Sequence, residues 1–232
     1  MENNYGLMLM NELADNPTVR LPICFCLDVS GSMFGAPINE LNSGVKQFFE
    51  ELLSDETTRF SSDIAIFTFG GDSAVCVRNF VGIDAEPHAP TLRANGRTPM
   101  GEAVNLALDM LNERKKEYRD NGVDYYHPWL VLMSDGSPNG NPEEFERAVK
   151  RTADMYNKKK LVVFPIGIGN EADLQTLASF TPGRPAMKMK GLKFKEFFSW
   201  LSKSVACVSS SNPGDNVQLP QDTLRQWLDI SV

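Results

Sequence analysis

Three oxygen-bearing side chains, Asp28, Ser30 and Ser32, follow directly after an apolar segment at residues 23–27. Carboxylate and hydroxyl oxygens are hard ligands, which suit Mg²⁺ or Mn²⁺ and not zinc. Mg²⁺ takes six oxygens in a nearly octahedral shell and usually keeps some of its waters. The spacing of one acid and two serines therefore indicates part of a divalent-metal site. The same residues would also suit a turn followed by a helix cap.

Two further candidate ligands, Thr98 and Asp135, lie far from this triplet in the chain. Asp135 comes shortly after a second apolar segment, residues 129–133, and Thr98 precedes a helical pattern. In open parallel sheets, ligands bind outside the carboxyl ends of the strands. If both apolar segments are strands of such a sheet, all of these side chains meet at one edge. The two carboxylates would then balance the charge of the ion, and the hydroxyls would complete its shell.

The elements that must position these residues alternate along the chain. Short apolar runs, typical of buried strands, alternate with apolar residues at helical spacing. This alternation predicts an α/β fold with a doubly wound, mostly parallel central sheet and helices on both faces. The short Gly-Gly-Asp link at residues 70–72 predicts a hairpin, and hence one antiparallel edge strand. We expect strands at residues 23–27, 64–69, 74–80, 129–133, 161–168 and 186–190, and helices near residues 37–52, 100–111, 141–158, 173–180, 194–205 and 222–230.

The composition is that of an ordinary globular protein, with 42% hydrophobic and 23% charged residues. A net charge of −7 argues against nucleic acid as a partner, and no apolar run approaches the ~20 residues of a membrane span. The four cysteines lack the paired spacing of zinc sites and indicate buried thiols in a reducing compartment. Residues 1–16 carry acids and amides rather than the pattern of a secretory signal, so we expect a cytoplasmic protein.

The chain is long enough for one domain with its own core. We predict an N-terminal extension at residues 1–20, one domain at residues 21–208, and a linker with a C-terminal tail at residues 209–232. The linker prediction rests on the Ser-Ser-Ser-Asn-Pro-Gly composition that begins this last segment. The tail presents Leu224, Trp227 and Leu228, and the sequence leaves open whether it docks on its own domain or on another protein.

The motifs around the candidate ligands resemble those of von Willebrand factor type A (VWA) domains. DVSGSM at residues 28–33 matches their D-x-S-x-S signature, and GRTPMGEAV at residues 96–104 resembles their threonine loop. LVLMSDG at residues 130–136 resembles their distal aspartate strand. The resemblance covers roughly residues 21–208. In detail the chain is most similar to stand-alone bacterial proteins of tellurite-resistance and stress gene clusters, the TerY type.

This resemblance implies a Rossmann-like VWA fold and a metal-ion-dependent adhesion site (MIDAS). In such a site Ser30, Ser32 and Thr98 would offer hydroxyls to the ion, and Asp28 and Asp135 would act directly or through water. The implied cofactor is Mg²⁺, or Mn²⁺ or Ca²⁺ in its place. The implied partner is a protein that offers an Asp or Glu carboxylate to the open metal position. The TerY type further implies a role in tellurite resistance or stress response, with a kinase and a phosphatase as candidate partners.

Two functional hypotheses follow from these residues. The first is a non-enzymatic binding module, favoured because no candidate base stands near the oxygen-bearing set. The second is a Mg²⁺-dependent phosphatase or hydrolase in which Asp28 is the nucleophile. Phosphatases of the haloacid dehalogenase type carry a second Asp two positions on, where this chain has Ser30. That difference favours the binding module.

Overall fold

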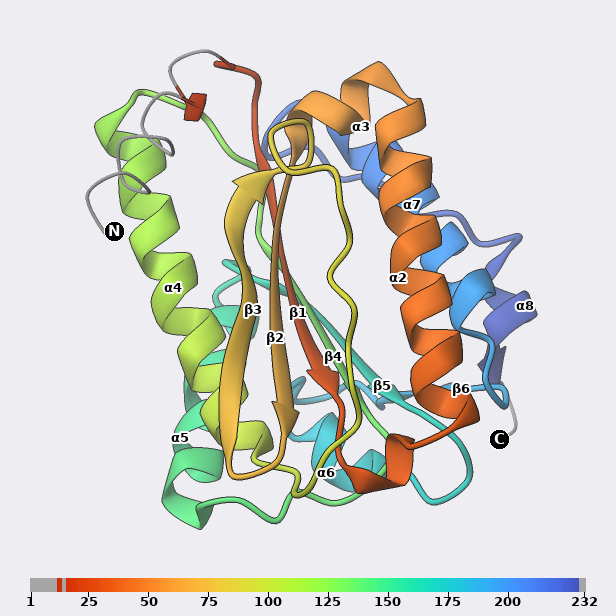
Figure 1. The fold of residues 1–232 in the computed structure, drawn as a ribbon. Coiled ribbons are helices and arrows are strands. Elements are labelled where there is room, and N and C mark those ends of the chain that lie inside the picture. The colour runs from red at the N-terminus through yellow and green to blue at the C-terminus, as the bar shows by residue number, and fades with distance from the viewer. Residues whose placement is uncertain (1–11, 14–15, 230–232) are drawn as a thin grey trace.

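The computed structural model describes residues 12–13 and 16–229, which form a central sheet with helices on both faces (Figure 1). Across these residues the sheet has the strand order β3-β2-β1-β4-β5-β6-β7. The strands from β2 to β6 in this order run parallel, whereas β3 and β7 pair antiparallel at the two edges. The strands are β1 (Leu21–Asp28), β2 (Ser62–Gly70), β3 (Ser73–Gly82), β4 (Trp129–Ser134), β5 (Val162–Gly167), β6 (Met187–Met189) and β7 (Leu228–Asp229).

The helices divide between the two faces of the sheet. α2 and α7 pack against each other on one face, and α4 and α5 pack on the other (Figure 1). This arrangement confirms the predicted α/β fold with a mostly parallel sheet and an antiparallel edge strand, β3. The helices are α2 (Ala36–Ser54), α3 (Glu56–Ser61), α4 (Met100–Asp120), α5 (Pro142–Asn157), α6 (Leu174–Ala178), α7 (Phe194–Ser209) and α8 (Leu224–Trp227), with a short 3-10 helix, η1 (Gly31–Met33).

The central strand β1 is buried on both faces along its whole length. Because successive side chains of a strand point to opposite faces, Phe25 packs toward α2 and α7, whereas Cys24 and Cys26 pack toward α4. Burial raises the pKa of both thiols. The expectation of buried cysteines is thus confirmed for this pair, but it is wrong for Cys207, which is exposed near the end of α7.

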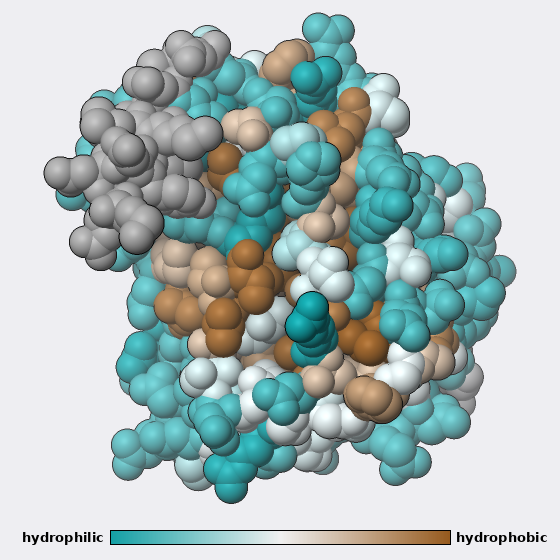
Figure 2. All heavy atoms as spheres, viewed as in Figure 1, coloured by the Kyte–Doolittle hydropathy of each residue, from teal (hydrophilic) through white to brown (hydrophobic). Residues whose placement is uncertain are grey.

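The outer edge strand β3 is buried on one face only. Figure 2 shows apolar side chains gathered over this edge of the molecule, and Val75 and Val77 of β3 are exposed. Ala74 and Cys76, which alternate with them, pack toward α4, so exposure alternates along the first half of the strand. This is the pattern of an antiparallel strand with one face toward solvent.

Buried charges join the N-terminal segment to the end of the sheet where β1 and β2 begin. Arg114 Nη2 lies 2.6 Å from Asp63 Oδ2 and 2.8 Å from Glu12 Oε2, and Glu12 also pairs with Arg20 at 2.7 Å. The hydroxyl of Tyr118 donates to Asp63 at 2.6 Å. Buried charges need such partners, because an unpaired charge in the interior is strongly destabilising. These contacts carry α4 well past residue 111, where its apolar pattern ends.

The C-terminal tail docks on its own domain. Trp227 is 0% exposed, and its ring lies 5.0 Å from that of Phe197 and 5.3 Å from that of Trp200, both in α7. The backbone N–H of Lys190 donates to the carbonyl of Trp227, and β7 then pairs with β6. The predicted tail helix is therefore shorter than expected, and residue 230 lies outside the described part. The division of the chain at residues 20 and 208 stays a prediction.

No helix in the described part of the chain has the length and hydropathy needed to cross a bilayer.

We predict that Trp227→Ala lowers the free energy of unfolding by about 3–5 kcal/mol, because it removes a fully buried aromatic side chain. Urea denaturation followed by circular dichroism measures this change. Gln226→Ala, at an exposed neighbouring position, is the matched control and should leave stability nearly unchanged. Equal stability of the two variants would show that the tail does not belong to the cooperative unit.

Candidate metal centre

The carboxylate of Asp28 joins the ends of two neighbouring parallel strands. Asp28 is the last residue of β1 and is 0% exposed, and Ser134 is the last residue of β4. Asp28 Oδ1 accepts a hydrogen bond of 2.8 Å from the backbone N–H of Ser30, and Oδ2 accepts one of 2.6 Å from the hydroxyl of Ser134. Both carboxylate oxygens are therefore used to hold the turn after β1 against the end of β4.

A chain of oxygen atoms leads from this buried acid to the surface. Ser30 Oγ lies 3.0 Å from Ser32 Oγ, and the Ser32 hydroxyl donates to Asp135 Oδ1 at 2.9 Å. Ser30 is buried and Ser32 is exposed. The oxygen atoms of these side chains thus face one another at the carboxyl edge of the sheet, where parallel sheets bind ligands.

Burial raises the pKa of Asp28, because the charged form is poorly solvated there. The hydrogen bonds from Ser134 and Ser30 act in the opposite direction, since they stabilise the carboxylate. The negative charge of Asp135 raises the pKa further. Two carboxylates held near each other make this edge a place where a cation would be stabilised.

Thr98 lies in a loop that is fixed to the Asp28 turn through the backbone. The N–H of Gly31 donates to the carbonyl of Gly96 at 3.0 Å. The N–H of Arg97 donates to the carbonyl of Gly71 at 3.2 Å. The N–H of Thr98 itself donates to the side chain of Asn139 at 2.7 Å. Thr98 is buried between these contacts, at the same edge of the sheet as the serines.

The structure therefore joins four of the sequence-predicted residues in one hydrogen-bonded network and places Thr98 in the adjoining loop. Two positioning residues, Ser134 and Asn139, were not among the predicted ligands. The sequence places the Ser134 hydroxyl at this strand end, directly before Asp135, but nothing in the sequence singles out Asn139. That these five side chains bind a metal ion remains a prediction.

The donor set has few carboxylates. Within the described residues, no group of three or more His, Cys, Asp and Glu side chains is placed to hold a metal ion. A cation at this edge would therefore depend on hydroxyl oxygens from Ser30, Ser32 and Thr98 as much as on acids. Such a donor set is oxygen-only, which suits Mg²⁺ or Mn²⁺.

A profile of the von Willebrand factor type A domain matches residues 23–197, the part of the chain that contains all five predicted ligands and most of the sheet, though not β7. The chain belongs to the von Willebrand factor type A domain family. The Rossmann-like arrangement of the sheet agrees with this assignment, as do the strand-end positions of Asp28 and Asp135.

Similar proteins come from several lineages. This VWA chain is 23% identical over 193 residues to inter-alpha-trypsin inhibitor heavy chain H2 of Sus scrofa, a match that covers 81% of the chain and 20% of that protein. The VWA chain thus spans about a fifth of the length of that curated relative.

Solved structures share the fold at low identity. The pilus adhesin SpaC from Lactobacillus rhamnosus GG has a TM-score of 0.61 and 12% identity, and the match covers 82% of this chain and 31% of that one. The manganese-loaded TRAP protein of Plasmodium vivax has a TM-score of 0.51 and 20% identity, over 72% of this chain and 64% of that one. These likenesses show the VWA fold and do not by themselves show a shared ligand.

The loop that carries Thr98 depends on a glycine at position 96. Gly96 has φ +58°, and a Cβ atom there would lie 2.5 Å from Cα of Gly71. We predict that Gly96→Ala destabilises the domain by more than the roughly 1–2 kcal/mol that the left-handed backbone alone costs. Urea denaturation measures the loss.

The matched control for this prediction is Gly122→Ala. Gly122 also has a positive φ, +68°, but a Cβ atom there would meet nothing within 4 Å. The free energy of unfolding of the control variant should therefore fall only by the cost of the left-handed backbone. If both variants lose the same free energy, close approach to Gly71 does not constrain the Thr98 loop.

Proposed function

We propose that this VWA domain is a metal-dependent protein-binding module of the MIDAS type. A cation bound at the sheet edge would supply an electrophilic position for a carboxylate of a partner protein. The observation that carries the proposal is the network of Asp28, Ser30, Ser32 and Asp135, which gathers oxygen ligands from two strand ends.

The spacing of these oxygens fits a small divalent cation. Neighbouring ligands of an octahedral ion at 2.0–2.1 Å lie about 2.9 Å from each other. The Ser30–Ser32 and Ser32–Asp135 oxygen distances are 3.0 and 2.9 Å. Ca²⁺ holds its ligands at 2.3–2.6 Å and would need these oxygens to be spread farther apart. These contacts are also ordinary hydrogen bonds, so the preference for Mg²⁺ or Mn²⁺ rests on the oxygen-only donor set rather than on the distances.

The chain's own residues have separate roles in this proposal. Asp28 holds Ser30 and Ser134 in place, and its negative charge lies just behind the exposed oxygens. Ser32 and Asp135 face outward, where an incoming acid would approach. Because the TRAP protein that shares this fold is manganese-loaded, Mn²⁺ is a reasonable probe for the site.

The environment of Asp28 argues against the alternative of a phosphatase or hydrolase. A nucleophilic carboxylate needs an oxygen free to attack the substrate. Asp28 is 0% exposed, and both of its oxygens accept hydrogen bonds from within the domain. We therefore propose a binding module without enzymatic activity.

The biological setting is proposed from the sequence motifs alone. The resemblance of residues 21–33, 35–52 and 89–104 to TerY-type proteins supports a cytoplasmic bacterial protein of a tellurite-resistance or stress system. A partner kinase or phosphatase that presents an Asp or Glu side chain fits this setting. The proposal includes no binding of nucleic acid or membrane, in keeping with the net charge of −7.

We expect Mn²⁺ to bind the isolated chain in isothermal titration calorimetry. Ser32→Ala should weaken binding by roughly 10-fold or more, because it removes a directly placed oxygen while leaving the buried Asp28 contacts intact. Ser137→Ala is the matched control, since this nearby hydroxyl bonds to Asp173 and not to the site. Equal affinity of the Ser32 and Ser137 variants would contradict the proposed ligand set.

Partner binding should depend on the cation. We expect the wild-type chain to retain a specific protein from lysate of the native cell in Mg²⁺ and to release it in EDTA, and the Ser32→Ala chain to retain none. Retention that EDTA leaves unchanged would contradict metal bridging. Turnover of p-nitrophenyl phosphate that requires Mg²⁺ and disappears in Asp28→Asn would instead favour the enzyme hypothesis.

A further inference from the structure

Part of one sheet edge is left without a strand beside it. Among the described residues, β6 pairs with β5 only at Ile166 and Gly167, because β6 is three residues long. The first four residues of β5, numbered 162–165, therefore have a strand partner on the β4 side only. This unpaired stretch faces a groove rather than open solvent, since residues 163–165 are buried.

The backbone groups that face this uncovered edge can be assigned from the pairing with β4. The N–H of Val162 donates to the carbonyl of Pro128, so Val162 faces β4. Successive residues of a strand direct their backbone groups to opposite sides, so Val163 and Pro165 face away from β4. Val163 can offer both an N–H and a carbonyl there. Pro165 can offer only a carbonyl, which keeps this stretch from extending a full ladder.

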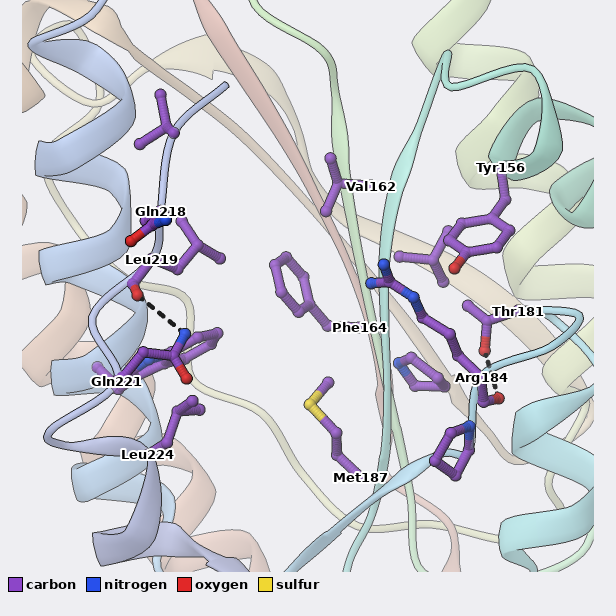
Figure 3. A pocket seen from close by; sticks show the side chains of 15 residues that line it. Tyr156, Val162, Phe164, Thr181, Arg184, Met187, Gln218, Leu219, Gln221 and Leu224 are labelled. Atoms are coloured by element: carbon purple, nitrogen blue, oxygen red, sulfur yellow. Dashed lines mark hydrogen bonds between the residues drawn. The ribbon is translucent and has the colours of Figure 1, made fainter. Parts of the chain in front are cut away.

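A groove of about 690 Å³ runs beside this edge, and we name it the β5 groove. Figure 3 shows Phe164 on the wall formed by the sheet and Gln218 and Leu219 on the opposite wall, with the Arg184 side chain extending toward β5. The lining is largely apolar. Its main apolar residues are Val162, Phe164, Met187, Trp200, Leu219 and Leu224.

Arg184 is the one lining residue that carries a full charge. Its side chain is exposed, and no carboxylate in the described part of the chain forms an ion pair with it. Its backbone is fixed, because its carbonyl accepts from the hydroxyl of Thr181. An exposed guanidinium beside an apolar wall, with no acid paired to it, is suited to bind a carboxylate from another molecule.

We propose that the β5 groove binds an extended segment of a partner protein that carries an acidic side chain. The segment adds as a short strand to the edge at Val163, its apolar side chains enter the groove, and its Asp or Glu pairs with Arg184. Four residues of β5 span about 13 Å, which is room for roughly four extended residues. A small organic acid would satisfy Arg184 but would leave the backbone edge unpaired, so a polypeptide fits the groove better.

This binding does not depend on the metal centre, because none of the predicted metal ligands lines the groove. Selection from a random nine-residue peptide library in EDTA tests the proposal. We expect the wild-type chain to enrich peptides that combine apolar or β-branched residues with one Asp or Glu. The Arg184→Glu chain should instead enrich Lys or Arg at that position, because the charge of the pocket is reversed.

Arg119→Glu is the matched control, since this exposed arginine lies on α4, away from the groove. Its peptides should match those of the wild-type chain. A peptide selected on the wild type should bind Arg184→Glu at least about tenfold more weakly in fluorescence anisotropy. It should also slow hydrogen exchange at the amide of Val163.

Several results would overturn the proposal. They are the absence of enriched peptides, equal binding of a selected peptide to the wild type and Arg184→Glu, and unchanged exchange at Val163. Loss of binding in Ser32→Ala would assign the peptides to the metal centre instead. Stabilisation by octanoate without peptide enrichment would show that the groove takes a small acid. Circular dichroism of each variant confirms that the chain is folded.

Discussion

The buried carboxylate of Asp28 is the constraint on which the arrangement of the site depends. A charged group removed from water is strongly unfavourable unless it is hydrogen-bonded. In this domain its two oxygens are satisfied by the backbone of Ser30 and the hydroxyl of Ser134, from different segments of the chain. β1 and β4 must therefore end side by side. That single requirement brings Ser32 and Asp135, more than a hundred residues apart, within 2.9 Å of each other.

Polar contacts at the two ends of the sheet place its elements relative to one another. At one end Asp28 of β1 meets Ser134 of β4, and at the other Asp63 of β2 meets Arg114 of α4. A shift of β1 by one residue would separate the first pair and turn its apolar side chains to the wrong face. The apolar core between these contacts supplies most of the burial, while the Asp28–Ser134 contact favours the observed register of β1 against β4.

The order of the elements and the position of the candidate site were predictable from the sequence, because local patterns determine both. Apolar runs and helical spacings predicted the order of elements, and the spacing of Asp28, Ser30 and Ser32 indicated a site at a strand end. The missed features depend on contacts between distant segments. Hydrophobic periodicity ended α4 too early, because Arg114 is buried by ion pairing. The strand β7 and the docking of Trp227 could not be predicted, since they depend on a surface that only the folded α7 provides.

The indole of Trp200 has neighbours on two sides. It packs against Trp227 in the tail, and it also forms part of the wall of the β5 groove. The helix that carries it, α7, packs along α2, which begins three residues after Met33 closes the turn of the serines. The tail residues Leu219 and Leu224 line the same groove as Trp200. Release of the tail from α7 would therefore remove one wall of the groove as well as the cover over Trp200.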